Sequence, residues 1–124
     1  MITLMLIGIF FTMSYGTPDD IVFTGKYDVN AGTHMMVLFI IQNGNTIYGT
    51  YDVPQGSGNF GYITGTVKGN RAEFTYIEVI YGEKRIHNSG SGYLVMDADN
   101  KGFMGSWKDK SKTYSGNWTG KRIY

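Results

Sequence analysis

The sequence contains no cysteine and only two prolines and two histidines among its 124 residues. Without cysteine the chain has no disulfide, no thiolate nucleophile and no cysteine-ligated metal, so packing and hydrogen bonds must hold the fold together. Positive and negative charges are also nearly balanced, with 11 basic residues and 10 acidic ones. This balance provides no basic surface for a phosphate backbone, and we expect no nucleic-acid partner.

Groups for metal binding or catalysis are scarce as well. His34 and His87 have no second histidine or carboxylate at ligand spacing, and neither a serine-histidine-acid set nor a glycine-rich phosphate loop occurs. Asp97 and Asp99 are spaced like the opening of a calcium loop, but Lys101 stands at a ligand position. The sequence therefore predicts no metal site, no cofactor and no catalytic residue.

Glycine and aromatic residues are abundant instead. The chain has 18 glycines, 15% aromatic residues and 42% hydrophobic residues. This composition is typical of short strands joined by tight turns, because glycine weakens helices. The length fits one domain, and no segment has a sustained helical period.

The N-terminal segment is an apolar run over residues 2–13, followed by Ser14-Tyr15-Gly16. It is shorter than the roughly 20 residues of a membrane-spanning helix, and small residues follow it where a signal peptidase would cleave. We interpret residues 1–16 as a signal peptide and residues 17–124 as one β-barrel domain, secreted or periplasmic and without a stable membrane span. The alternative is an extra apolar strand or a short helix that covers the barrel.

Turn signals divide the rest of the chain into strands. Asn43-Gly44-Asn45 and Lys68-Gly69-Asn70 are typical of tight hairpin turns, and a longer turn follows at residues 97–102. The strands predicted between the turns are residues 22–28, 34–42, 46–53, 60–68, 71–81, 87–97, 102–109 and 113–123. About eight strands with mostly short connections predict an all-β fold, a single up-and-down antiparallel β-barrel.

One pattern recurs in five of these strands, a glycine two positions before a large side chain. The five instances are Gly25-Lys26-Tyr27, Gly49-Thr50-Tyr51, Gly65-Thr66-Val67, Gly105-Ser106-Trp107 and Gly116-Asn117-Trp118. Residues two apart in a strand point to the same face. We expect these pairs to face the interior, where each glycine lets the strand bend and makes room for a ring from the next strand.

Two segments, residues 34–41 and 75–81, are apolar on both faces of their strands. Outward apolar surface requires a cover. A homo-oligomer interface is one explanation, and packing of an uncleaved N-terminal segment is the other. In the second segment Glu78 falls on the apolar face, where it either pairs with a base such as Arg85 or Arg122 or anchors a ligand.

The opening strand with Gly25-Lys26-Tyr27, followed by Tyr48-Gly49-Thr50-Tyr51, resembles the first hairpin of calycin-type barrels, the lipocalins and especially the avidins. The resemblance implies that the Tyr27 ring plugs the barrel floor and that Lys121 or Arg122 of the last strand covers it. The closing glycine-x-tryptophan strands are also similar to a bacterial family of secreted barrels of unassigned activity.

The avidin resemblance implies a ligand position but not biotin. Thr33 and Tyr51 correspond to residues that contact the ureido oxygen of biotin, whereas Val29 and Val53 stand where avidins have further polar groups. A buried ureido group would lose hydrogen-bond partners at a cost of about 1–3 kcal/mol each.

Three functions follow as hypotheses. The first is a non-enzymatic barrel that holds a small, partly apolar molecule in an aromatic cup. The residues assigned to this cup are Tyr27, Thr33, Tyr51, Tyr76, Glu78, Trp107 and Trp118, with Arg122 as the floor cation. The second is a structural or protein-interaction barrel with a filled interior, and the third is an enzyme that uses Glu78 as acid or base.

Overall fold

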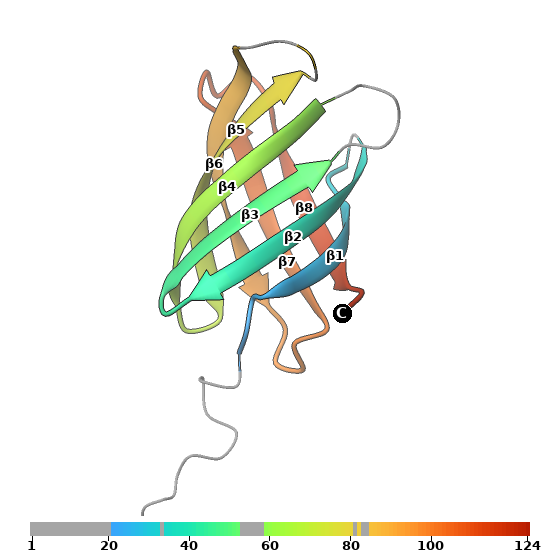
Figure 1. Ribbon diagram of the computed structural model, residues 1–124, viewed down its shortest axis with the longest axis vertical. Helices are drawn as coiled ribbons and strands as arrows, with labels where there is room; N and C mark the ends of the chain where they lie inside the picture. Colours follow the sequence, from blue (N-terminus) through green and yellow to red (C-terminus); the bar gives the residue numbers. More distant parts are fainter. Residues whose placement is uncertain (1–20, 33, 53–58, 81, 83–84) are drawn as a thin grey trace, which may run out of the picture.

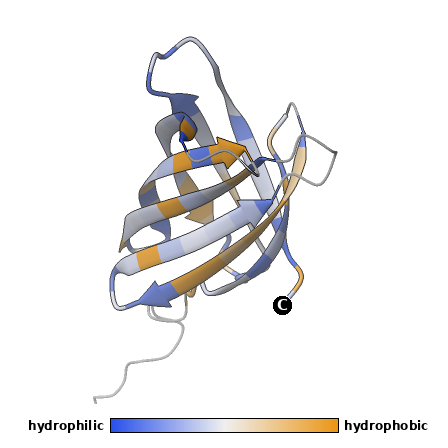
Figure 2. Ribbon diagram, turned by 45° about the horizontal axis from the view of Figure 1, so that its top comes forward, coloured by the Kyte–Doolittle hydropathy of each residue, from blue (hydrophilic) through white to orange (hydrophobic). Residues whose placement is uncertain are grey.

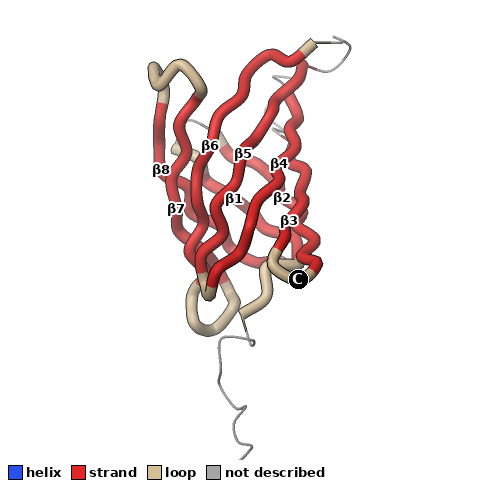
Figure 3. The backbone as a smooth tube through the Cα atoms, turned by 90° about the vertical axis from the view of Figure 1, so that its left-hand side faces the viewer, coloured by secondary structure: helices blue, strands red, loops and turns tan. Residues whose placement is uncertain are grey.

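The computed structural model describes residues 21–32, 34–52, 59–80, 82 and 85–124. Its strands are β1 (Gly25–Asn30), β2 (Met35–Asn43), β3 (Thr46–Asp52), β4 (Asn59–Lys68), β5 (Arg71–Ile80), β6 (Ile86–Met96), β7 (Gly102–Asp109) and β8 (Ser115–Arg122). Each strand pairs antiparallel with the next, and β8 pairs with β1, so the sheet closes into a barrel (Figures 1 and 3). The predicted all-β, up-and-down barrel is confirmed.

The barrel has two distinct ends (Figure 1). The turns β2–β3, β4–β5 and β6–β7 lie at one end together with the C-terminus, and we call this the closed end. The other connections lie at the opposite, open end. No described helix is long and apolar enough to cross a membrane. The interpreted signal peptide, residues 1–16, lies outside the described residues.

Two tight turns at the closed end follow from their glycines. Gly44 and Gly69 have φ of 63° each, a backbone conformation that glycine adopts without strain. The turns fix the register of their hairpins, because the last pairs before each turn are Asn43 with Thr46 and Lys68 with Arg71. Both turns were predicted at these positions.

The first and last strands are shorter than predicted. β1 begins at Gly25 because the preceding backbone bonds to side chains, with the Val22 N–H on Asn100 Oδ1 at 2.9 Å and the Phe23 N–H on Gln42 Oε1 at 2.8 Å. β8 begins two residues late because the Asp109 carboxylate accepts the N–H groups of residues 113 and 114, at 3.0 and 3.2 Å. The ends of two other predicted strands, residues 53 and 81, lie outside the described residues.

Inward glycines stand opposite rings of the neighbouring strand. Gly92 pairs with Phe74, and a Cβ on Gly92 would lie 2.7 Å from the Phe74 ring. Gly120 pairs with Phe103 in the same way, and its Cβ would lie 2.2 Å from that ring. Contacts this short are impossible for a real Cβ, so only glycine fits at either position while the ring stays in place.

A column of rings fills the barrel from the closed end upward. Tyr27 packs edge-on against Phe103 with ring centroids 5.2 Å apart, and Phe103 is 6.5 Å from Trp118. Trp118 in turn lies 5.3 Å from Phe74 and 6.4 Å from Tyr51. A cavity lies on the side of Trp118 that faces the open end.

Arg122 closes the floor beneath this column. Its guanidinium carbon lies 4.9 Å from the centre of the Tyr27 ring. Its three nitrogens donate to backbone carbonyls of Asn100 at 2.5 Å, Thr24 at 2.5 Å and Val22 at 2.7 Å. One side chain thus joins the start of the described chain, the β6–β7 turn and the last strand.

The outer face of β2 to β5 carries several exposed apolar side chains. Figure 2 shows a long hydrophobic stretch along β2 that ends in a hydrophilic tip. Five side chains on neighbouring strands are exposed here and form what we call the outer apolar face: Phe39, Ile41, Tyr48, Tyr62 and Ile77. Ile41 and Tyr48 are direct cross-strand partners, as are Tyr62 and Ile77, whereas Tyr48 and Tyr62 face threonines across the β3–β4 pair.

Candidate functional site

A cavity of about 70 Å³ lies at the open end, above the column of rings, and we call it the cup. This volume is about that of two water molecules. The residues that line it are Ala31, His34, Met36, Tyr51, Tyr76, Glu78, Asn88, Trp107 and Trp118. Aromatic walls with a few polar groups are typical of small-molecule sites.

Glu78 is held on the inner face of β5 by two hydrogen bonds. The Tyr51 hydroxyl donates to Glu78 Oε2 at 2.7 Å, and the Asn59 amide nitrogen lies 3.3 Å from Oε1. Arg122 lies at the closed end, so of the two bases considered as partners of Glu78, Arg85 and Arg122, the structure excludes Arg122. A tyrosine and an amide bond to this carboxylate.

Gly61 makes the Tyr51–Glu78 bond possible. Tyr51 on β3 pairs with Gly61 on β4, which pairs with Glu78 on β5. A Cβ on Gly61 would lie 2.3–2.5 Å from the Tyr51 ring and hydroxyl. The ring therefore crosses β4 over a position that has no side chain, and its hydroxyl reaches the third strand.

Tyr76 crosses its neighbouring strand in the same manner. It pairs with Gly90, whose Cβ would lie 2.6 Å from the Tyr76 hydroxyl. Burial and the nearby charges of Glu78 and Asp109 raise the pKa of Tyr76 to about 12. Burial, together with the Glu78 carboxylate, also raises the pKa of Tyr51 above its ordinary range. Both hydroxyls therefore remain protonated at neutral pH and can donate hydrogen bonds.

Both tryptophans of the chain line the cup. Trp118 is 4% exposed, and its indole Nε1 is buried with no hydrogen-bond partner. The Trp107 Nε1 is buried and unpartnered too, and its ring edge lies against Gly116. A buried N–H group without an acceptor lowers the stability of the fold by about 1–3 kcal/mol. The Trp118 ring lines the cavity, and its N–H group lacks the acceptor that a buried donor normally has.

The structure brings together five of the seven residues assigned to the cup from sequence, namely Tyr51, Tyr76, Glu78, Trp107 and Trp118. Tyr27 is not among them, because it lies at the closed end, fully buried beneath Phe103. Thr33 lies outside the described residues.

Sequence reasoning did not assign Asn88 and Asn59 to the site. Asn88 is the cross-strand partner of Glu78, and Asn59 bonds to it from β4. Asn88 is two residues before the inward Gly90, so its alternation with Gly90 and Gly92 on β6 was a usable signal. Asn59 gave no such signal, because it follows directly on a stretch of glycine and serine.

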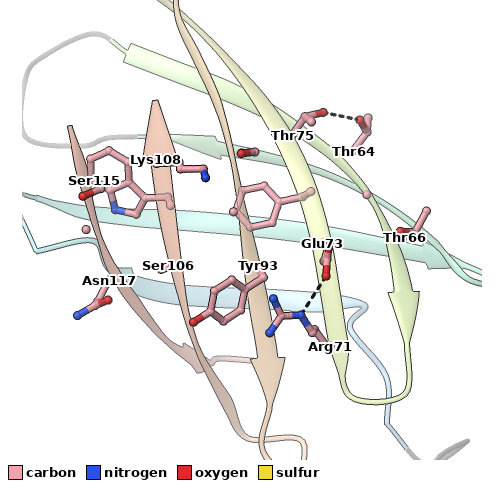
Figure 4. A pocket seen from close by; sticks show the side chains of 16 residues that line it. Thr64, Thr66, Arg71, Glu73, Thr75, Tyr93, Ser106, Lys108, Ser115 and Asn117 are labelled. Atoms are coloured by element: carbon pink, nitrogen blue, oxygen red, sulfur yellow. Dashed lines mark hydrogen bonds and ion pairs between the residues drawn. The ribbon is translucent and has the colours of Figure 1, made fainter. Parts of the chain in front are cut away.

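A second, larger depression of about 850 Å³ lies on the outer face of β4 to β8 (Figure 4). It is broad and open, and hydroxyl side chains such as Thr66 and Ser106 surround it. Arg71 bonds to Glu73 at 3.2 Å and stacks 3.9 Å from the centre of the Tyr93 ring. Arg71 and Glu73 already pair with each other and contact solvent, so the smaller and more enclosed cup is the stronger candidate site.

No group of three or more histidine, aspartate or glutamate side chains in the described part of the chain is placed to hold a metal ion. Asp97 and Asp99 lie in the β6–β7 turn, where the Lys101 N–H donates to Asp99 Oδ1 at 3.0 Å. We find no match to this chain among family models, curated proteins or solved structures. The proposed function therefore rests on the geometry of the cup.

Proposed function

We propose that this protein is a non-enzymatic barrel that binds a small, partly apolar molecule in the cup. The single observation that carries the proposal is the Trp118 indole N–H, which is buried and unpartnered in a side chain that lines the cavity. A ligand with an acceptor atom would accept a hydrogen bond from this N–H group, and the surrounding rings would bury the carbon atoms of the ligand.

The resemblance to calycin-type barrels supports the same proposal. The up-and-down order of eight strands and the Arg122 guanidinium over the first-strand ring agree with what that resemblance implies. Calycin kinship and secretion are part of the proposal. The small volume of the cup means that only part of a larger ligand would enter it, with the rest at the mouth.

The test uses the two indole N–H signals in a nitrogen–proton NMR spectrum, because Trp107 and Trp118 are the only tryptophans and both line the cup. A panel of small metabolites is added to the mature chain. We expect a binder to shift the Trp118 signal as its N–H gains an acceptor, and to bind Trp118→Phe more weakly.

Tyr62→Phe, which changes an exposed ring on the outer face, serves as the control and should bind like the wild type. A panel in which no compound shifts either indole signal would contradict the proposal. Binding that leaves both indole signals in place would show that the ligand site lies elsewhere.

The outer apolar face favours a second candidate function, self-association of a barrel whose interior serves only packing. The partner proposed is a second copy, because a two-fold contact places the same apolar surface on both sides. Sedimentation equilibrium of the mature chain should then show a dimer that Ile41→Lys dissociates, since Ile41 is 64% exposed. A strict monomer at all concentrations would remove this candidate.

A further inference from the structure

The negative charge of the cup comes from one residue. Among the described residues that line the cup, Glu78 is the only acidic side chain, His34 is the only basic one, and there is no lysine or arginine. Its two hydrogen bonds occupy one site on each oxygen, whereas a carboxylate offers about four lone-pair sites. The carboxylate can therefore accept further bonds from a ligand.

The walls around this carboxylate are electron-rich rings. Tyr51 and Trp118 stand nearly perpendicular, at 75° with centroids 6.4 Å apart, and form a corner of the cup. Tyr76 and Trp107 contribute two further rings to the lining. The faces of tryptophan and tyrosine attract cations, most strongly where water is excluded.

These features discriminate between ligand charges. An anion in the cup would lie near Glu78, and the described lining holds no lysine or arginine to offset the repulsion. A neutral ligand would gain nothing from the Glu78 charge. A cation satisfies both the carboxylate and the rings, and the Trp118 N–H still needs an acceptor.

We infer that the ligand is a small primary amine in its ammonium form that also carries a neutral hydrogen-bond acceptor. The ammonium group contacts Glu78 and the surrounding rings, and the acceptor takes the Trp118 N–H. The cup of about 70 Å³ holds the ammonium and its adjoining carbon atoms, while the rest of the molecule lies toward the mouth. This inference rests on the proposed function and specifies its ligand class.

The experiment compares three probes of similar size that share one hydroxyl group: aminopropanol, propanediol and hydroxypropanoate. Their other ends are cationic, neutral and anionic. Each is titrated into the wild-type chain at neutral pH and low salt, and the shifts of the two indole signals give the dissociation constant. We expect aminopropanol to bind about tenfold more tightly than propanediol, and hydroxypropanoate to bind most weakly.

Glu78→Gln should abolish the preference for aminopropanol over propanediol, because it removes the charge and keeps the shape. Glu73→Gln is the matched control, since Glu73 lies on the same strand but faces outward and pairs with Arg71, and it should keep the preference. The comparison of probes on the wild type stands even if Glu78→Gln does not fold.

The outcomes separate this inference from the proposed function. Equal or tighter binding of propanediol or hydroxypropanoate would overturn the inference and leave a binding cup. Absence of any shift with aminopropanol would also overturn it. If the wider metabolite panel shifts neither indole signal as well, the proposed function fails with it.

Discussion

The Tyr51 hydroxyl donates a 2.7 Å hydrogen bond to Glu78 from two strands away, and its ring crosses the intervening strand at Gly61. A strand residue ordinarily contacts its direct cross-strand partner. Here the missing side chain of Gly61 extends the reach of Tyr51 by one strand. The shape of the cup therefore depends on Gly61 as well as on the aromatic rings. Substitutions of Gly61, Tyr51 and Glu78 can test these contributions one at a time.

Tyr51→Phe removes the hydroxyl that bonds to Glu78 and leaves the ring in place. We expect the free energy of unfolding to fall by about 1–3 kcal/mol, because a partly buried carboxylate loses a donor. Urea denaturation measures the change. Tyr62→Phe alters an exposed hydroxyl and should stay within about 0.5 kcal/mol of the wild type, and an equal effect of both variants would contradict the expectation.

Gly61→Ala places a methyl group within 2.3–2.5 Å of the Tyr51 ring and hydroxyl. We expect a loss of about 1–3 kcal/mol in the free energy of unfolding, since a well-packed interior must shift to accept the added atom. The displaced Tyr51 ring packs against Trp118, so the Trp118 indole signal should move as well. Thr66→Ala on the outer face of β4 should change neither quantity, and an unmoved indole signal in Gly61→Ala would refute the proposed contact.

Alkaline pH should destabilise the barrel through its buried tyrosines. Burial raises the pKa of Tyr27 to about 12, against an opposing effect of Arg122, and the pKa of Tyr76 to about 12, from an ordinary value of 10.0. The unfolded chain therefore ionises first, so the stabilisation is complete below about pH 10 and is lost as pH rises through about 12.

Denaturation midpoints measured from neutral pH to pH 12, with tyrosinate absorbance recorded in parallel, check this expectation. Tyr76→Phe should make the midpoint less sensitive to pH in this range. A midpoint of the wild type that stays constant up to pH 12 would contradict it.

Arg122→Gln should destabilise the closed end without changing the cup. The variant loses the charged donors on the carbonyls of Val22, Thr24 and Asn100, and we expect a loss of about 1.5–3 kcal/mol. Lys121→Gln, one residue away and exposed, is the control and should have little effect. The chemical shift of the Trp118 indole N–H should stay the same as in the wild type. A large change in it would mean that the two ends of the barrel are coupled.

Much of the barrel was predictable because its signals are local. The tight turn from Lys68 to Arg71 sets the register of β4 and β5, and that register alone places Gly61 opposite Glu78. Alternation within strands likewise predicted which faces carry the rings. These features depend on a few consecutive residues.

The rest of the cup depends on contacts between strands whose register no short turn fixes. The pairing of Tyr51 with Gly61 follows the longer β3–β4 connection, and the register shift after Glu78 has no visible sequence signal. Topology alone excludes Arg122 as the base beside Glu78, because in an up-and-down barrel odd and even strands end at opposite ends. Glu78 lies near the end of the fifth strand and Arg122 ends the eighth.

The pairing of β1 with both β2 and β8 has a consequence for how copies of this chain can meet. A sheet closed in this way presents no free row of backbone N–H and C=O groups along an outer strand, so strand addition between molecules has no starting point. Association through the eight described strands must therefore use side chains. Contacts of that kind should separate with single surface substitutions, and the strong β-propensity of the chain need not lead to fibres.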